Sequence, residues 1–279
     1  MAKHLIGCTL WSLGIPDTVD AIRKVAELGL QAIQFTFQQE SDLQPAGINR
    51  IKEALKACGL KVPGGMVGFA GEDYSSIAAI RRTGGFVDAA VFPERLDRCR
   101  RWGEAMARLG MTHVTTHAGF LPEPGRPDYA AVRDRLAAAA DALHESGLTV
   151  GLETGQESGA VLVQVLKDLA RPWLSANFDP ANLILYGSDD PVSAARALAG
   201  RVSMMHAKDG TPSDRPGETW GEEVPLGMGK VDFRGVIAAL EKGGFTGALI
   251  IEREAGNDRA GDILAGRRFL DGLLAPKGG

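Results

Sequence analysis

The stretch Glu145-Ser-Gly-Leu-Thr-Val-Gly-Leu-Glu153 joins the end of a helix, a short apolar strand and an acidic residue. Glycine readily adopts the left-handed backbone conformation that ends many helices, after which the chain can turn into a strand. The same unit of amphipathic helical stretch, glycine and apolar strand occurs six times in the chain. Its glycines stand at positions 29, 59, 110, 147, 200 and 244. This regular alternation of helix and strand predicts a parallel sheet.

The apolar runs predict eight strands, each with room for a helix after it. They are Leu5–Leu10, Ala32–Phe35, Lys61–Val62, Thr112–Thr115, Thr149–Leu152, Trp173–Phe178, Val202–Met205 and Gly247–Ile250. Helices are predicted at Thr18–Leu28, Asp88–Leu109, Ala130–Glu145, Ser158–Ala170, Val192–Leu198, Phe233–Lys242 and Arg259–Leu274. We therefore expect an α/β fold, a single-domain (β/α)8 TIM barrel over residues 1–274, with a frayed tail at 275–279.

An open doubly wound sheet would share this alternation of strands and helices. Its dinucleotide-binding form, however, needs a glycine-rich turn directly after the first strand, where this chain has Leu10-Trp-Ser-Leu-Gly14. Two connections are longer than usual, Gly68–Val87 and Lys208–Lys230, and long loops often act as functional lids. Within the second, Gly227-Met-Gly229 could bring N–H groups to a phosphate, with Lys208 or Lys230 adding charge.

The composition limits the function classes. With 279 residues, 44% hydrophobic and 24% charged, the chain can bury a large core. Its net charge of −4 and pI near 5.8 disfavour a nucleic-acid partner. The three cysteines match neither a disulfide framework nor a paired zinc motif, which fits a reducing compartment. Because every apolar run is short, we expect no secretion signal, no membrane span and a cytoplasmic location.

In a parallel barrel, catalytic side chains collect where the strands end, because every strand-to-helix loop opens on that face. The residues at the ends of the apolar strands are His117, Glu153, Asp179, His206 and Glu252. Ionised carboxylates are costly to bury there unless a cation compensates them. Three carboxylates and one imidazole suit Mn, Mg or Co better than structural zinc, which favours Cys and His.

Four of these residues also have an ordinary structural explanation, and Glu252 taken alone is ambiguous. Glu153 could pair with Lys208 or Arg253, Asp179 could cap the next helix, and His206 could be a hydrogen-bonded core histidine. For His117, packing beside the site or a hydrogen bond to a substrate is the simpler interpretation. The occurrence of four such residues at four successive strand ends favours a shared metal site.

These residues lie in motifs that resemble the xylose isomerase-like TIM barrels, the sugar phosphate isomerase/epimerase superfamily that includes ketose 3-epimerases. The motifs are Gly151-Leu-Glu153, Asn177-Phe-Asp-Pro-Ala-Asn-Leu183, Met205-His-Ala-Lys-Asp209, Val224-Pro-Leu-Gly-Met-Gly-Lys-Val-Asp-Phe233 and Ile250-Ile-Glu-Arg-Glu254. The resemblance spans nearly the whole chain and implies one divalent metal ion, Mn in preference to Mg or Co. It makes Glu153, Asp179, His206 and Glu252 the metal ligands, and Glu153 and Glu252 the acid/base pair.

Two positions depart from the family's epimerases. Many have a substrate-binding histidine where this chain has Asn182, and an arginine where it has Pro212. Asn182 can still hydrogen-bond a sugar hydroxyl, and Lys208 or Arg215 could supply the cation. The residues predicted to contact a substrate are Asn182, Lys208, His117, Trp11, Phe69 and Arg215, with the two aromatic side chains as apolar walls.

The resulting hypothesis is a metal-dependent isomerase or epimerase that takes a proton next to the carbonyl of a ketose or related small sugar, free or phosphorylated, through an enediolate that the metal stabilises. A lyase that dehydrates a keto-inositol, a dehydroshikimate or a 3-keto-glycoside is an alternative, and a non-catalytic barrel that binds sugar and metal is another. An abasic-site endonuclease is disfavoured, because its three-metal pattern needs more histidines than the five present. The resemblance also suggests a homo-dimer or homo-tetramer.

Overall fold

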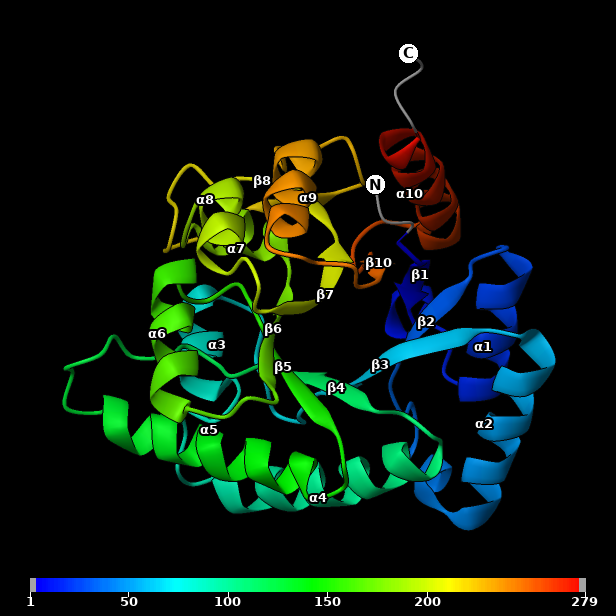
Figure 1. Cartoon of the computed structure of the whole chain (residues 1–279), viewed down its shortest axis with the longest axis horizontal. Helices are drawn as coiled ribbons and strands as arrows, with labels where there is room; N and C mark the ends of the chain where they lie inside the picture. The colour runs from blue at the N-terminus through cyan, green and yellow to red at the C-terminus, as the bar shows by residue number, and fades with distance from the viewer. Residues whose placement is uncertain (1–3, 276–279) are drawn as a thin grey trace.

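The computed structural model describes residues 4–275, which form one closed barrel of eight parallel strands surrounded by helices (Figure 1). Around the barrel the strands follow the order β1-β10-β7-β6-β5-β4-β3-β2, so the first and last barrel strands pair directly. The predicted fold class is confirmed. The predicted frayed tail lies, from residue 276 on, outside the described residues.

The strands coincide closely with the predicted apolar runs. They are β1 (Ile6–Thr9), β2 (Ala32–Phe35), β3 (Lys61–Val67), β4 (His113–Thr116), β5 (Thr149–Glu153), β6 (Leu174–Phe178), β7 (Val202–Ala207) and β10 (Leu249–Ile251). Strand β3 runs further than predicted, through Pro63-Gly64-Gly65. A side chain at Gly65 would place its Cβ 2.5 Å from the sulfur of Met106, so glycine here permits close packing against a helix.

The helices lie outside the strands. They are α1 (Thr18–Glu27), α2 (Pro45–Cys58), α3 (Ile77–Thr83), α4 (Phe92–Arg108), α5 (Tyr129–His144), α6 (Gly159–Leu169), α7 (Pro180–Tyr186), α8 (Pro191–Ala197), α9 (Phe233–Lys242) and α10 (Arg259–Leu274), with 3-10 helices η1 (Trp11–Leu13) and η2 (Glu40–Leu43). Helix α1 shows how local sequence defines these elements, because the Asp17 carboxylate accepts hydrogen bonds from the N–H groups of Val19 and Asp20. Within residues 4–275, no helix combines the length and apolarity needed to cross a membrane.

Both long connections contain regular structure that the sequence analysis described only as loops. The first includes α3, which Ser76 caps and whose Ile77 and Ile80 pack against Tyr186. The second forms a small antiparallel pair, β8 (Asp209–Thr211) with β9 (Glu222–Val224). Helix α7 was also missed, although Asp179 caps it and Pro180 begins it. All of these elements are short and lie at the carboxyl end of the barrel, where they surround the candidate site.

Candidate active site and metal centre

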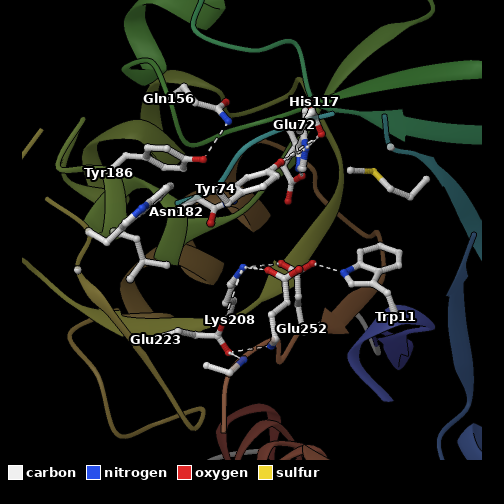
Figure 2. A pocket seen from close by; sticks show the side chains of 18 of the residues that line it. Trp11, Glu72, Tyr74, His117, Gln156, Asn182, Tyr186, Lys208, Glu223 and Glu252 are labelled. Atoms are coloured by element: carbon white, nitrogen blue, oxygen red, sulfur yellow. Dashed lines mark hydrogen bonds and ion pairs between the residues drawn. The ribbon is translucent and has the colours of Figure 1, made fainter. Parts of the chain in front are cut away.

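A cavity of about 790 Å³ opens at the carboxyl end of the barrel, and its residues come from loops that follow many different strands (Figure 2). Its volume is in the range of small-molecule sites. Of the residues predicted from the sequence, those that line it are Trp11, His117, Glu153, Asn182, Lys208 and Glu252. These segments are far apart in the chain, and the closed barrel brings them together.

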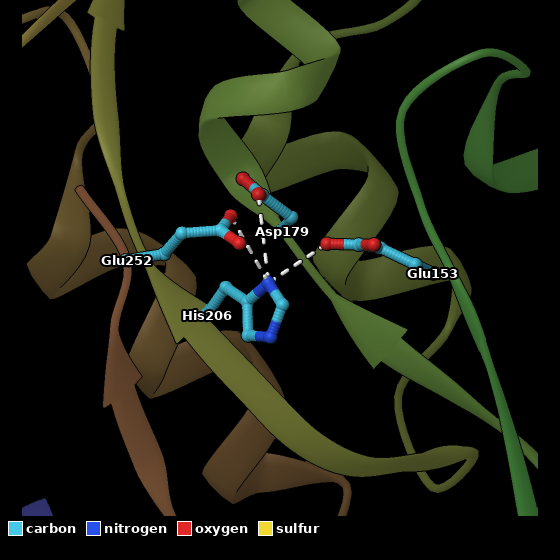
Figure 3. A group of neighbouring side chains, drawn as sticks. All are labelled: Glu153, Asp179, His206 and Glu252. Atoms are coloured by element: carbon cyan, nitrogen blue, oxygen red, sulfur yellow. Dashed lines mark ion pairs between the residues drawn. The ribbon is translucent and has the colours of Figure 1, made fainter. Parts of the chain in front are cut away.

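Four side chains meet beside this cavity, and two of them, Glu153 and Glu252, line it (Figure 3). Glu153 ends β5, Asp179 follows β6, His206 lies in β7 and Glu252 follows β10. All four are buried, and one possible ligand atom from each lies within 4.8 Å of the others. The His206 Nδ1 atom lies 2.7 Å from Glu153 Oε1, 3.4 Å from Glu252 Oε2 and 3.8 Å from Asp179 Oδ2. The group could hold a metal ion.

Two atoms of this cluster indicate whether a cation would fit. Asp179 Oδ2 and His206 Nδ1 are buried and have no hydrogen-bond partner among the described residues, whereas Glu153 Oε2 contacts His117 Nε2. Leaving buried polar atoms unpaired is costly, and the cost is larger when the group carries charge. A divalent cation bound to these atoms would compensate the carboxylates and use the free imidazole nitrogen, so the donor set fits a metal.

The orientation of the His206 ring depends on a residue that the sequence analysis missed. Gln34 in β2 donates a hydrogen bond from its Nε2 to Thr115 Oγ1 at 2.8 Å, which turns its oxygen toward His206. His206 Nε2 lies 2.5 Å from that oxygen and donates to it. In the neutral imidazole Nδ1 therefore carries the lone pair that faces the carboxylates, an arrangement typical of histidine ligands supported by a neighbouring acceptor. The signal available in the sequence was a single glutamine within the apolar run Ala32-Ile-Gln-Phe35, and the structure shows this glutamine to be buried.

Asp179 combines its structural role with its place in the cluster. Its Oδ1 accepts hydrogen bonds from the backbone N–H groups of Ala181 and Asn182, at 2.8 and 3.0 Å, and so caps α7. Its Oδ2 is the unpaired atom that faces His206. The helix-cap interpretation and the metal-site interpretation thus apply to different oxygens of one carboxylate.

The ionisation of the cluster reflects its excess of negative charge. Burial alone would raise the pKa of Glu153, but His117 and His206 hold that pKa at about 2. Burial raises the pKa of Asp179 to about 6. Burial alone would lower the pKa of His206, yet Glu252 and Glu153 raise it well above its usual value. Positive charge is therefore strongly favoured at the centre of this cluster.

Each of the two glutamates is held by neighbouring donors. Trp11 Nε1 donates to Glu252 Oε1 at 2.8 Å, and Lys208 Nζ donates to Glu252 Oε2 at 3.1 Å. On the other side, His117 Nε2 contacts Glu153 Oε2. The second nitrogen of His117 lies 3.1 Å from the hydroxyl of Tyr74. These contacts fix how the carboxylates face the cavity.

Two residues predicted to contact substrate do not line the cavity. Phe69 is buried against Phe86, with ring centroids 5.2 Å apart, and Arg95 stacks over its ring. Arg215 points to solvent, with 68% of its side chain exposed, and pairs with Glu218 at 3.7 Å. Phe69 is thus part of the hydrophobic core, and Arg215 contributes no cation to the cavity.

The Gly227-Met-Gly229 segment also differs from its predicted role. Its N–H groups do not face the cavity as a phosphate site would require, because the Asp209 carboxylate accepts hydrogen bonds from Gly227 and Gly229 at 3.0 and 2.9 Å. Lys230 is exposed and does not line the cavity.

Sequence reasoning missed several other lining residues, which share a position in the long loops or beyond the strand ends. They are Glu72, Tyr74, Gln156, Tyr186, Trp220, Glu223 and Glu254. Only Glu254 stood in a recognised motif, and the others lie in segments without a periodic pattern.

Comparisons with known proteins agree with this architecture. A family model described as a xylose isomerase-like TIM barrel matches residues 22–273. A putative L-ribulose-5-phosphate 3-epimerase of Escherichia coli K12 is 31% identical over 114 residues, which span 39% of this chain and 39% of that protein. The chain therefore matches well under half the length of this curated relative.

Two solved structures extend the comparison to the whole fold. A xylose isomerase domain protein from Planctomyces limnophilus superposes with a TM-score of 0.86 at 31% identity, covering 90% of this chain and 91% of the other. A D-allulose 3-epimerase from Methylomonas sp. in complex with D-allulose has a TM-score of 0.72 at 16% identity, covering 98% of each chain, and is similar in fold alone. With a family model that covers most of its length, the chain belongs to the xylose isomerase-like TIM barrel family.

Proposed function

We propose that the protein is a divalent-metal-dependent sugar isomerase or epimerase that moves a proton next to the carbonyl of a ketose or related small sugar. One observation carries the proposal: Glu153 and Glu252 both line the cavity and point toward the same His206 Nδ1 atom, from its right and its left in Figure 3. The similarity to an L-ribulose-5-phosphate 3-epimerase over part of the chain supports the same reaction class.

The two glutamates supply the base and the acid. A proton beside a carbonyl is weakly acidic, so its removal needs a positioned base and stabilisation of the charge that develops on oxygen. A divalent ion held by Glu153, Asp179, His206 and Glu252 would supply that stabilisation as a Lewis acid. For epimerisation, one glutamate takes the proton from one face and the other returns a proton to the opposite face. For isomerisation, one carboxylate carries the proton between neighbouring carbons.

The residues around the glutamates prepare them for this role. Glu252 is held at one oxygen by Trp11 and at the other by Lys208, which keeps it ionised. Glu153 contacts His117, whose other nitrogen faces the Tyr74 hydroxyl. Both carboxylates are therefore oriented before a substrate binds, and such preorganisation lowers the cost of reaching the reactive geometry.

We further propose Mn as the metal, with Mg or Co as substitutes, because three carboxylates and one imidazole form an oxygen-rich set. Asn182 lies beside the cluster and lines the cavity, where its amide could hydrogen-bond a sugar hydroxyl. The elimination alternative gains no support from the relatives described above.

Deuterium exchange tests the function directly. The protein is loaded with Mn and incubated in D2O with a panel of ketoses and ketose phosphates, and exchange at the carbon beside the carbonyl is followed by NMR. Exchange with at least one sugar is expected, and exchange with none would overturn the proposal. An ultraviolet-absorbing enone would instead indicate a lyase, and sugar binding without either reaction would indicate a binding protein.

A further inference from the structure

The outer part of the cavity is acidic. Beyond the metal cluster, Glu72, Glu223 and Glu254 line it, whereas Lys208 is the one lysine or arginine among the lining residues in the described range 4–275. Glu72 is ionised, because although its burial alone would raise its pKa, His117 lowers that pKa below the usual value. Even with a divalent ion on the cluster, the carboxylates around the cavity outnumber its positive charges. An anionic group on a ligand, such as the phosphate of a sugar phosphate, would therefore be repelled.

The cations near this part of the cavity are already paired. Lys208 Nζ lies 2.7 Å from Glu254 and 3.1 Å from Glu252, with only 6% of its side chain exposed (Figure 2). Arg253, which is buried behind the cavity, pairs with Glu223 at 2.7 Å and with Asp262 at 2.8 Å. A phosphate would have to break one of these buried pairs to gain a cation, which is costly because the carboxylate would then be left unpaired.

The usual anion site of such barrels is occupied by a side chain of this protein. Loops after the seventh and eighth barrel strands often bind phosphate through backbone N–H groups. Here the Asp209 carboxylate accepts hydrogen bonds from four such groups, those of Gly210, Gly227, Gly229 and Val231, at 2.9 to 3.1 Å. At Gly229 a Cβ would lie 2.1 Å from Asp209 Oδ1, so glycine is needed for this contact. The N–H groups that could hold a phosphate already hold an internal carboxylate.

Aromatic rings line the same region. Tyr74, Tyr186 and Trp220 face the cavity beside Glu72, Glu223 and Glu254. Aromatic faces pack against the C–H groups of sugars, and carboxylates accept hydrogen bonds from sugar hydroxyls. Given the sugar chemistry proposed for the metal cluster, on which this conclusion rests, we infer that the cavity selects an unphosphorylated sugar and that Glu223 and Glu254 determine this specificity by excluding anions.

A matched substrate pair tests the inference. The Mn-loaded protein is given L-ribulose or L-ribulose 5-phosphate in D2O, and kcat/KM for exchange is measured for each. At least a tenfold preference for the free sugar is expected. An equal or greater value for the phosphate would overturn the inference while leaving the proposed function intact. Exchange with neither sugar would count against the proposed function. The preference for an unphosphorylated ligand would then be tested by binding alone.

The binding arm needs no turnover. Ribitol and ribitol 5-phosphate are titrated into the Mn-loaded protein, and the fluorescence of Trp11 and Trp220, which line the cavity, reports occupancy. Ribitol is expected to bind at least tenfold more tightly at low ionic strength. Tighter or equal binding of the phosphate, or binding of neither polyol, would overturn the inference.

A charge-reversal variant tests the residue assignment. Glu254→Lys should reduce the preference for the free sugar over its phosphate about tenfold, because it removes an anion from the cavity and adds a cation. Glu218→Lys is the matched control, since it makes the same change in net charge beside Arg215, outside the cavity lining. An unchanged preference in Glu254→Lys, or an equal change in both variants, would overturn the role of Glu254.

Discussion

The two ends of the barrel each bury a histidine, and the two differ in how their nitrogens are satisfied. At the amino end, His113 Nδ1 lies 2.8 Å from Thr149 Oγ1 and Nε2 lies 3.0 Å from Ser203 Oγ. At the carboxyl end, His206 Nδ1 faces three carboxylates without a hydrogen bond. Burial lowers the pKa of His113 to about 4, whereas the carboxylates raise that of His206.

This difference separates a structural polar cluster from a candidate ligand site. Around His113 the donors and acceptors match, and Gly151 leaves room for the ring, because a Cβ there would lie 3.2 Å from His113 Nε2. Around His206 three carboxylates share one imidazole nitrogen, an imbalance that a protein does not maintain for stability alone. Unpaired carboxylate and imidazole atoms, rather than burial alone, therefore distinguish the His206 cluster from the His113 cluster.

The largest expected effect comes from removing a charge at the carboxyl end. Glu153→Gln should lower the exchange rate about 10²–10⁴-fold, because the base is lost while the volume is kept. Deuterium exchange with the best sugar substrate measures the loss, and circular dichroism checks the fold. The control is Glu157→Gln, because burial raises the pKa of Glu157 to about 8 and the side chain is already mostly neutral at pH 7. Equal losses of exchange rate in both variants would contradict the assignment of Glu153 as the base.

Metal should stabilise the folded protein through the same end. Mn at 100 times its dissociation constant is expected to add about 2.7 kcal/mol to the free energy of unfolding, since unfolded chains lack the assembled site. Scanning calorimetry with and without EDTA measures this shift. Asp179→Asn should weaken it, because the variant removes one carboxylate from the cluster. A Tm independent of Mn in the unmodified protein would show that the cluster holds no metal.

At the amino end, substitution should affect stability and leave catalysis largely intact. His113→Leu is expected to cost about 1–3 kcal/mol, because it removes the two hydrogen bonds that the buried ring makes with Thr149 and Ser203. Urea unfolding measures the loss, and kcat should stay within about threefold of the unmodified protein. A large loss of kcat at unchanged stability would mean that the two ends are not functionally separate.

The smallest expected effect is a pH dependence that comes from His113. Its folded pKa of about 4 lies below the ordinary value near 6.5, so the unfolded chain binds the extra proton between these values. The stability due to neutral His113 is therefore complete above pH 6.5 and is lost as the pH falls toward 4, by at most about 1.4 kcal/mol per pH unit. Urea unfolding at pH 7 and pH 5 should show a smaller pH difference in His113→Gln. An identical difference in both proteins would contradict this assignment.

Local sequence patterns predicted the barrel well because strands and long helices carry their own signals. Helix-ending glycines and apolar runs indicated the eight strands, and α9 and α10 agree in both bounds with the predicted ranges. The short elements were missed because they depend on tertiary contacts. Helix α3 has only seven residues and packs its isoleucines against Tyr186, which lies more than 100 positions later in the chain.

The candidate site also has features that local sequence predicts and features that depend on tertiary contacts. The sequence alone determined which residues stand at the strand ends, because the pleated strand and its closing turn are local, and these include Glu153, Asp179, His206 and Glu252. Only the tertiary structure decided which charges are free and which are already paired. Lys208 and the Gly227–Gly229 segment were plausible phosphate contacts until Glu254 and Asp209 were seen to occupy them. Pairing of charges depends on side chains that folding brings together from distant segments, and no local pattern records it.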